Sequence, residues 1–352
     1  MMKVIAYASS QGAFNQIFSL ITLLSDYNIS ATLFLSHGAL YCQPLIHNPS
    51  IVLKELDELD IFLSDEGNID NCFSLIGLSA YTHTCELYFT TLCLKLSIPS
   101  ICVQDYPGFY GNFNDKVHPD CFLIPDNFPI KPKFGFQKSI PHLHIPNPFH
   151  LLLSSDSDRT SLIKDNIRKI QPRHNALFMQ PIAISGMLYN FNNFLSLLPS
   201  SVQYDVILHP EDYSNKDIFT KIPTLKKDNI RVLDSQIDSL SSLACCRKLV
   251  TCYSTVSLQL EDSFFPFPVK CKEVHYLFSG SQITHSFQAS SNLRYPPKLR
   301  TIKTYIHKTT ASFSEIFMDN SDFWIDCHHQ KLLVDRRTQL ALKLSTLLNL
   351  DK

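Results

Sequence analysis

Short apolar runs alternate with amphipathic stretches along the first half of the chain. After the turn at Gly12, apolar residues recur at the spacing of one helical face, which predicts a helix there. Further helices are expected over residues 51–59 and up to Leu96. The runs expected to be strands cover residues 3–9, 31–35, 61–63, 73–76, 100–103 and 121–124. This alternation predicts βαβ units around a parallel sheet.

A second alternating set follows a break near residue 150. Three prolines lie within residues 140–148 and polar residues fill 154–158, which is typical of a domain boundary. Later strands are expected at residues 176–179, 204–208, 230–233 and 248–252, with helices at 190–198, 240–244 and 331–348. The sequence therefore predicts an α/β protein with two Rossmann-like parallel-sheet domains, residues 1–150 and 151–330, facing a cleft, and a C-terminal helix in residues 331–352.

Two apolar runs of the second half stop abruptly on polar residues. One ends at His209, Pro210 and Glu211, and the other ends at Ser254 and Thr255. Because the carboxyl ends of parallel strands lie side by side, where open α/β sheets bind ligands, these residues predict a nucleotide-sized site. A helix after Ser254 would add backbone N–H groups for a phosphate.

Composition narrows the classes of partner. The 352 residues are 45% hydrophobic and 18% charged, with a net charge of -1, so a packed protein with a large core is expected. No Lys/Arg run suggests nucleic-acid binding, and no apolar stretch is long enough to span a bilayer. We expect a cytoplasmic protein, with peripheral membrane contact and oligomeric state left open. The eleven cysteines form no Cys-x-x-Cys pair and are interpreted as structural thiols.

The two strand ends carry a resemblance to a known family. Two successive parallel-sheet domains with these ends resemble the GT-B nucleotide-sugar glycosyltransferases. Leu208-His-Pro-Glu211 and Tyr253-Ser-Thr-Val256 are similar to elements of bacterial sialyltransferases, capsule-polymer transferases and sugar-nucleotide epimerases. Asp65-Glu-Gly67, expected at the end of the strand at residues 61–63, is similar to the sialyltransferase motif that supplies the catalytic base. The order of the three elements matches as well.

The resemblance implies roles for particular residues. Asp65 or Glu66 would be the base, and His209 would donate to phosphate or act as leaving-group acid. Pro210, Glu211, Ser254, Thr255 and Gln259 would bind the donor, where relatives have Glu in place of Gln259. The glycine-rich phosphate loop of several relatives is missing around Ser185-Gly186, so phosphate binding would depend on helix ends.

Reasoning from the strand ends leaves rivals for the base. Glu86 lies near the start of its helix and Asp105 ends its own strand, so both could line the acceptor side together with the turn at Gly12. If these residues have only structural roles, Glu86 would be a charge that favours the helix start and Asp105 would favour a turn. A carboxylate becomes a competent base when burial raises its pKa toward neutrality.

These observations predict a glycosyltransferase that moves a sugar from a nucleotide-sugar to a carbohydrate acceptor. The alternatives are a sugar-nucleotide epimerase or hydrolase, or a non-catalytic nucleotide-sugar-binding protein. No cofactor beyond the nucleotide-sugar is expected. Metal independence is predicted, because Asp-x-Asp occurs only at Asp156-Ser-Asp158 in the presumed linker, and Cys327-His328-His329 has no partner at zinc spacing.

Overall fold

The computed structural model divides into two compact units, with the boundary after Ser155. Unit 1 comprises the described residues up to Ser155 together with Leu340, and unit 2 runs from Ser157 to Phe317. The structure describes residues 2–40, 48–78, 84–105, 110, 113–126, 139–155, 157–180, 182, 186–213, 215–234, 239–252, 254, 256–261, 267, 269–278, 299, 302–317 and 340.

Unit 1 contains a seven-stranded sheet in the order β3-β2-β1-β4-β5-β6-β7, in which every neighbouring pair is parallel. Apolar side chains of the central strands are buried on both faces, as expected of a parallel sheet covered by helices. The strands are β1 (Lys3–Ala8), β2 (Ser30–Leu35), β3 (Ile51–Glu55), β4 (Cys72–Leu78), β5 (Ser100–Gln104), β6 (Cys121–Pro125) and β7 (His142–Ile145).

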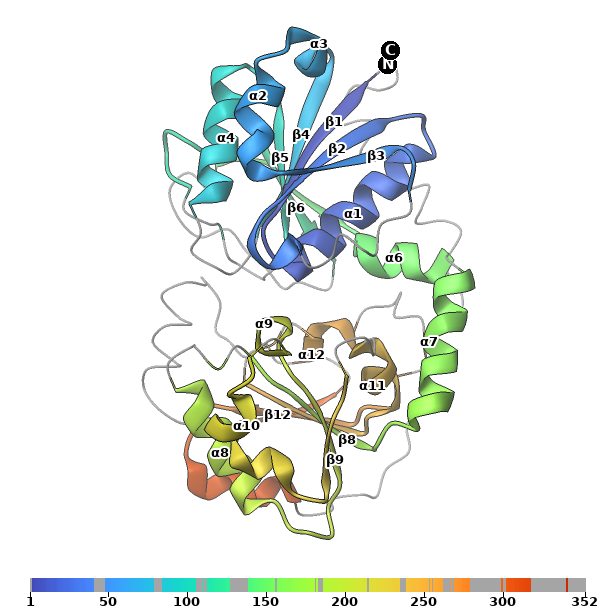
Figure 1. The fold of residues 1–352 in the computed structure, drawn as a ribbon, viewed down its shortest axis with the longest axis vertical. Helices are drawn as coiled ribbons and strands as arrows, with labels where there is room; N and C mark the ends of the chain where they lie inside the picture. The colour runs from blue at the N-terminus through green and yellow to red at the C-terminus, as the bar shows by residue number, and fades with distance from the viewer. Residues whose placement is uncertain are drawn as a thin grey trace. The chain divides into compact units, whose positions relative to one another are not determined.

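Helices cover both faces of this sheet (Figure 1). Helices α1 (Gln11–Ser25) and α6 (Pro148–Ser155) lie together on one face, and α2 (Leu59–Leu63) and α4 (Cys85–Lys95) lie on the other. Helix α1 approaches β4 closely at Gly77, where a Cβ atom would lie 2.9 Å from Ala13 Cβ. The glycine therefore allows α1 to pack directly on the middle of the sheet.

Residues 51–63 differ from the prediction, because strand and helix are exchanged there. Residues 51–55 form the edge strand β3, and residues 59–63 form helix α2, after the short 3₁₀ helix η2 (Leu56–Glu58). Leu59 and Leu63, four positions apart, are buried, whereas Ile61 between them is 78% exposed. The apolar run at residues 61–63 is thus one turn of an amphipathic helix.

Unit 2 contains a six-stranded, fully parallel sheet in the order β10-β9-β8-β11-β12-β13. The predicted α/β class with two parallel-sheet domains is confirmed. The strands are β8 (Asn175–Phe178), β9 (Tyr204–Ile207), β10 (Ile230–Val232), β11 (Lys248–Thr251), β12 (Glu273–Leu277) and β13 (Lys303–His307).

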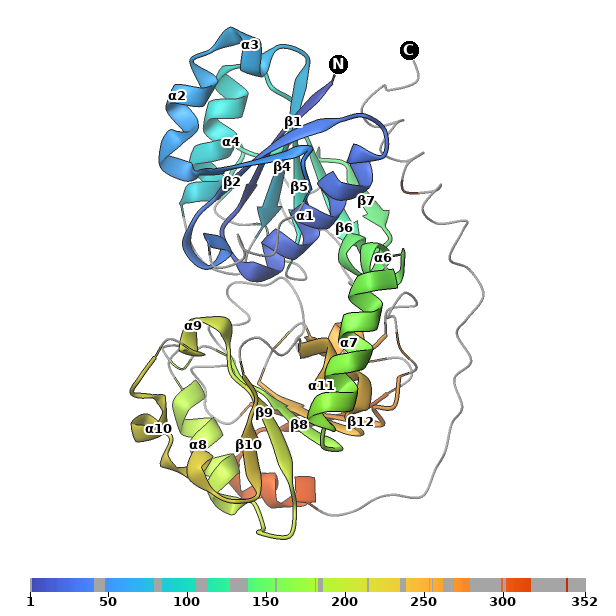
Figure 2. The same cartoon turned by 45° about the vertical axis from the view of Figure 1, so that its right-hand side comes forward.

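The helices of unit 2 also lie on both faces of its sheet (Figure 2). Helix α8 packs beside the 3₁₀ helix η4 on one face, and α7 packs beside α11 on the other. The elements are α7 (Ser157–Ile170), α8 (Met187–Leu197), α9 (Pro210–Tyr213), α10 (Ile218–Lys221), η3 (Pro223–Lys226), α11 (Ser239–Cys245), α12 (Val256–Gln259) and η4 (Thr310–Phe317). The short α3 (Glu66–Ile69) belongs to unit 1.

The sequence predicted a linker near residue 150 and a helix at residues 331–348. The proline-rich stretch at residues 140–148 contains strand β7, and the polar stretch at residues 154–158 contains the end of α6 and the start of α7. The predicted helix at residues 331–348 lies outside the described residues apart from Leu340, which is buried. Among the helices of the described ranges, none combines the length and apolar character that crossing a bilayer requires.

Each sheet has one point where the strand order reverses. In unit 1 the chain leaves β1 for β2 and β3 on one side and then returns to β4 on the other side. In unit 2 the same reversal separates β8 from β11. Open α/β sheets bind ligands at the carboxyl ends of the two strands that flank such a reversal. We call the sheet edge formed by strand carboxyl ends the carboxyl edge, and the opposite edge the amino edge.

Candidate functional site

The turn between β1 and α1 lies at the reversal point of unit 1. Ser9 and Ser10 follow the buried strand β1 directly, and the Ser10 hydroxyl accepts a 3.1 Å hydrogen bond from the Ala13 N–H. This N-cap satisfies one of the backbone donors at the helix start and fixes where α1 begins. The turn therefore presents its side chains at the carboxyl edge in a defined conformation.

Glu86 is held at this turn. It lies in the first turn of α4, is only 3% exposed, and accepts a 2.9 Å hydrogen bond from the Ser9 hydroxyl. Sequence analysis did not select Ser9 as a site residue, although a polar residue directly after a buried strand is the same signal that selected Asp105. Two elements far apart in sequence thus meet at the carboxyl edge.

Asp105 reaches the same turn from β5. Its carboxyl group occupies the space that a side chain at position 12 would need, because a Cβ atom there would lie 2.5 Å from Asp105 Cγ. Only glycine at position 12 permits this approach. The Asp105 N–H donates to the Leu78 carbonyl oxygen at 3.2 Å, which joins the ends of β4 and β5. Burial raises the pKa of Asp105 to about 7.

Gly12, Glu86 and Asp105, all predicted on the acceptor side, are therefore brought together with Ser9. We refer to these four residues as the carboxylate site. A carboxyl group with a pKa near 7 can give and take a proton at neutral pH, which is what general acid–base chemistry requires. The reversal of strand order in the sheet, rather than a local sequence motif, brings these four residues together.

Asp65 and Glu66 lie elsewhere. The expectation that they end a strand is wrong, because they follow helix α2 and precede β4. Asp65 caps the short α3 by accepting a 2.9 Å hydrogen bond from the Gly67 N–H, and Lys3 at the start of β1 donates to the Gly67 carbonyl oxygen. Both acidic residues are exposed at the amino edge. The geometry gives Asp65 a capping role, and both residues lie at the opposite end of the strands from Glu86 and Asp105.

In unit 2, Gln180 joins the two strands at the reversal point. Its amide nitrogen donates to the Thr251 hydroxyl at 3.0 Å, and its amide oxygen accepts from the Cys252 N–H at 2.9 Å. The side chain is 5% exposed. Gln180 follows β8 and was not selected from the sequence, although its position after a buried strand matches that of His209. It fixes the carboxyl ends of β8 and β11 side by side.

His209 lies one strand further, directly after β9. Burial lowers the pKa of His209 to about 4, so the imidazole is neutral at pH 7. The Asp212 N–H donates to the His209 carbonyl oxygen at 2.8 Å, and the Asp212 carboxylate accepts from the Ile182 N–H at 3.1 Å. Asp212 therefore links the His209 corner to the segment after β8. A neutral imidazole can donate one hydrogen bond and accept another, whereas acid catalysis would first require a ligand that favours its protonation.

The remaining donor-side residues are placed by their elements. Ser254 follows β11, is half-buried, and accepts a 3.3 Å hydrogen bond from the Val256 N–H at the start of α12. Gln259 is the last residue of α12. Pro210 and Glu211 begin α9. Thr255 lies outside the described residues. The predicted helix after Ser254 is confirmed.

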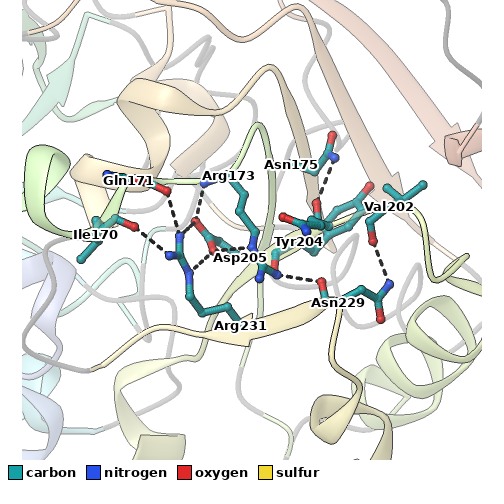
Figure 3. A network of polar contacts seen from close by, with 10 residues as sticks. Ile170, Gln171, Arg173, Asn175, Val202, Tyr204, Asp205, Asn229 and Arg231 are labelled. Atoms are coloured by element: carbon teal, nitrogen blue, oxygen red, sulfur yellow. Dashed lines mark hydrogen bonds and ion pairs between the residues drawn. The ribbon is translucent and has the colours of Figure 1, made fainter.

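An extensive polar network of unit 2 lies at the other edge of the sheet (Figure 3). Asp205 at the amino end of β9 is fully buried and accepts from Arg231 Nε at 2.8 Å, Arg231 Nη2 at 2.9 Å and the Arg173 N–H at 2.8 Å. Arg231 and Arg173 also donate to backbone carbonyl oxygens, including those of Ile170 and Asn229. The network ties the end of α7 to β9 and β10 and is structural.

Metal ligation has no support in the described residues, since no group of three His, Cys, Asp or Glu side chains among them could hold an ion. Cys327-His328-His329 lies outside the described residues. The predicted metal independence stays a prediction. Nine cysteines are described and all are free thiols, among them the buried Cys93 and Cys102.

Comparison with known proteins identifies the fold but no family. No family model and no curated protein sequence matches the chain. The UDP-GlcNAc 2-epimerase of Methanocaldococcus jannaschii, solved with UDP-GlcNAc and UDP, is 10% identical, with a TM-score of 0.61 and coverage of 99% of this chain and 100% of that one. The Neisseria meningitidis UDP-GlcNAc 2-epimerase bound to UDP-GlcNAc has 12% identity, a TM-score of 0.60 and the same coverage.

A third similar structure is UGT71G1 of Medicago truncatula complexed with UDP-glucose, with 10% identity, a TM-score of 0.54 and coverage of 99% and 98%. The two parallel-sheet domains therefore form a GT-B-like fold. The resemblance suggested by the His-Pro and Ser-Thr elements is confirmed for the fold. The narrower likeness to sialyltransferases depended on Asp65-Glu-Gly67, which does not end a strand.

Proposed function

We propose that this protein is an enzyme that acts on a nucleotide-sugar and converts the nucleotide-sugar itself, as an epimerase or a hydrolase does. The observation that carries the proposal is the Asp105 carboxyl group, seated on Gly12 at the reversal point with a pKa of about 7. At neutral pH this group exists in both protonation states. It can therefore remove a proton in one step and return one in another, which an epimerisation needs.

The GT-B-like fold supports the same class of substrate. The two epimerases and UGT71G1 cover this chain almost completely, and all three were solved with UDP-sugars. The two epimerases have the higher TM-scores of the three. Together with the proton chemistry available to Asp105, this favours conversion of the nucleotide-sugar without a separate acceptor over transfer of its sugar.

We assign the two carboxyl edges different tasks. In unit 1, Asp105 transfers protons, and Glu86, fixed by Ser9, supports it with a second carboxyl group. In unit 2, the neutral His209 imidazole and the Ser254 hydroxyl supply hydrogen bonds to the nucleotide and its phosphates. Gln180 and Asp212 keep the strand ends of unit 2 in place. No metal is required in this scheme, because protein donors provide the hydrogen bonds.

The test is incubation with a panel of UDP-, GDP- and CMP-sugars in the absence of any acceptor, starting with UDP-GlcNAc and UDP-glucose. The proposal predicts an epimeric nucleotide-sugar or a free nucleotide, detected by NMR or chromatography. Asp105→Asn should slow the conversion at least about a hundredfold, whereas the matched Asp65→Asn at the amino edge should not change it. Absence of conversion with every member of the panel would contradict the proposal.

Glycosyl transfer is the second candidate, and the near-complete match to UGT71G1 with UDP-glucose favours it. Here Asp105 would act as a base toward an acceptor hydroxyl. The same panel separates the two functions, because a transferase consumes the nucleotide-sugar only after carbohydrate acceptors are added. Binding without conversion under both conditions would favour the non-catalytic binding protein instead.

A further inference from the structure

His37 has a backbone conformation that sets it apart from its counterparts in the described residues. Five non-glycine residues there have positive φ angles: Asn28, His37, Asn71, Ser97 and Gln171. Four of them follow a helix and precede a strand, where a left-handed residue ends the helix. His37 instead follows strand β2, with φ at 48°. Helix termination therefore does not explain its conformation, and such outliers often occur at functional sites.

The side chain of His37 is oriented by a buried chain of hydroxyl groups. His37 Nδ1 lies 2.9 Å from the Ser36 hydroxyl, and the Ser36 hydroxyl lies 2.7 Å from the Tyr7 hydroxyl. Tyr7 is fully buried in β1 and its ring stacks on Phe89 of α4. The imidazole itself is exposed. A rigid element thus holds an exposed ring in a fixed direction, which reduces the entropy cost of binding a ligand.

The position of His37 relates it to the carboxylate site. Strands β1 and β2 pair in register up to Ala8 and Leu35, so His37 lies at the same carboxyl edge as Ser9. The segment after His37 packs against the β1–α1 turn, because the Ala39 N–H donates to the Ser9 carbonyl oxygen at 3.3 Å. The same turn holds Glu86 and Asp105. His37 therefore belongs to the edge that carries the proton chemistry.

We propose that His37 binds the sugar part of the nucleotide-sugar by hydrogen bonding to a sugar hydroxyl. This inference rests on the proposed function. Imidazole nitrogens match the donor and acceptor pattern of sugar hydroxyls, and the carboxylate site next to this segment is where the sugar would react. Ser36 is then a positioning residue, because it orients the ring without touching the substrate.

The experiment follows the ring signals of protein labelled with ¹³C-histidine during titration with UDP-GlcNAc, UDP-glucose and UDP alone. His37→Asn identifies the His37 signal and keeps the backbone, because Asn tolerates the left-handed conformation. The inference predicts that the His37 signal moves with at least one of the two UDP-sugars but not with UDP. His37→Asn should weaken binding of that UDP-sugar roughly five- to tenfold, the effect of one hydrogen bond, and leave UDP binding unchanged.

Two further variants test whether Ser36 orients the ring and whether the effect is specific to His37. Ser36→Ala should weaken binding of the UDP-sugar by a smaller factor while leaving UDP binding unchanged. His144→Asn removes an exposed histidine of the same unit from β7 and should change neither affinity. A His37 signal that moves equally with UDP, or stays fixed while the His209 signal moves, would overturn the sugar contact and spare the proposed function. If no histidine signal moves and no nucleotide-sugar of the panel is converted, the proposed function fails as well.

Discussion

Asp205 is fully buried and Asp105 is half-buried, and their surroundings have opposite effects on the two carboxyl groups. Asp205, at the amino edge of unit 2, is surrounded by Arg231 and the Arg173 backbone, and it accepts three hydrogen bonds of 2.8 to 2.9 Å from them. Asp105, at the carboxyl edge of unit 1, rests on Gly12, and burial raises its pKa to about 7. A carboxylate that is paired with arginine contributes to structure, whereas a carboxyl group whose pKa burial raises to near 7 is available for proton transfer.

The acidic and basic residues described above show the same division between the two edges of each sheet. The amino edges carry capping and pairing interactions, such as Asp65 with the Gly67 N–H and Arg231 with Asp205. The carboxyl edges carry side chains whose pKa values burial shifts, namely Asp105 in unit 1 and His209 in unit 2. Both shifts favour the neutral form. The location of an acidic residue on the sheet is therefore more informative about its role than the short motif in which it occurs.

The largest effect is expected from Asp105→Asn. Asparagine keeps the shape of the side chain but cannot exchange a proton, so turnover should fall at least about a hundredfold, the usual contribution of a general acid or base. The measurement is the initial rate of nucleotide-sugar conversion at neutral pH. Turnover close to that of the wild-type protein would show that the aspartate at the carboxyl edge does no chemistry.

Asp205→Asn tests the structural role of the other aspartate. Two arginine side chains would lose a buried anionic partner, so the free energy of unfolding should fall by about 3 kcal/mol, as for other buried pairs that lose one member. Urea denaturation measures this loss. Turnover of the folded fraction should stay within about twofold of the wild-type value. A stable but inactive variant would reverse the assignment of the two aspartates.

Gly12→Ala tests the contact between the turn and Asp105. The added methyl group would lie 2.5 Å from Asp105 Cγ, so the carboxyl group must move and turnover should fall roughly tenfold. Gly67→Ala is the matched control, because its methyl group would meet only Asp65 Oδ1, at 3.2 Å. Conversion assays should show no more than a twofold change for the control. Equal losses in both variants would mean that the Gly12 contact has no special role.

The smallest effect concerns stability against pH. The folded-state pKa of Asp105 is raised from the ordinary value of 3.8 to about 7, so its contribution is complete below pH 4 and is lost as pH rises toward 7. Asp105→Asn has no ionisable group at this position, so it does not lose this stability as pH rises. Its melting temperature relative to wild type should therefore increase by about a few degrees between pH 5 and pH 8. A constant difference across that range would indicate an ordinary pKa.

Much of the fold could be predicted from the sequence because buried parallel strands are continuous apolar runs, as at residues 3–9 and 100–103. Residues 51–63 could not, because β3 is an edge strand in which only Ile51 is buried, so the apolar pattern there does not distinguish strand from helix. That error placed Asp65 at a strand end. The link between Glu86 and Ser9 depends on the order of strands in the sheet, which local patterns do not encode.

The most direct test of the central claim is the titration of the Asp105 side-chain carboxyl carbon by ¹³C NMR, with Asp105→Asn to identify its signal. The account predicts a midpoint near pH 7, well above the ordinary value of 3.8. A midpoint near 4 would show that this carboxyl group is ionised throughout the neutral range. It would then be a simple charge, and the proposed proton transfer at the carboxyl edge of unit 1 would be contradicted.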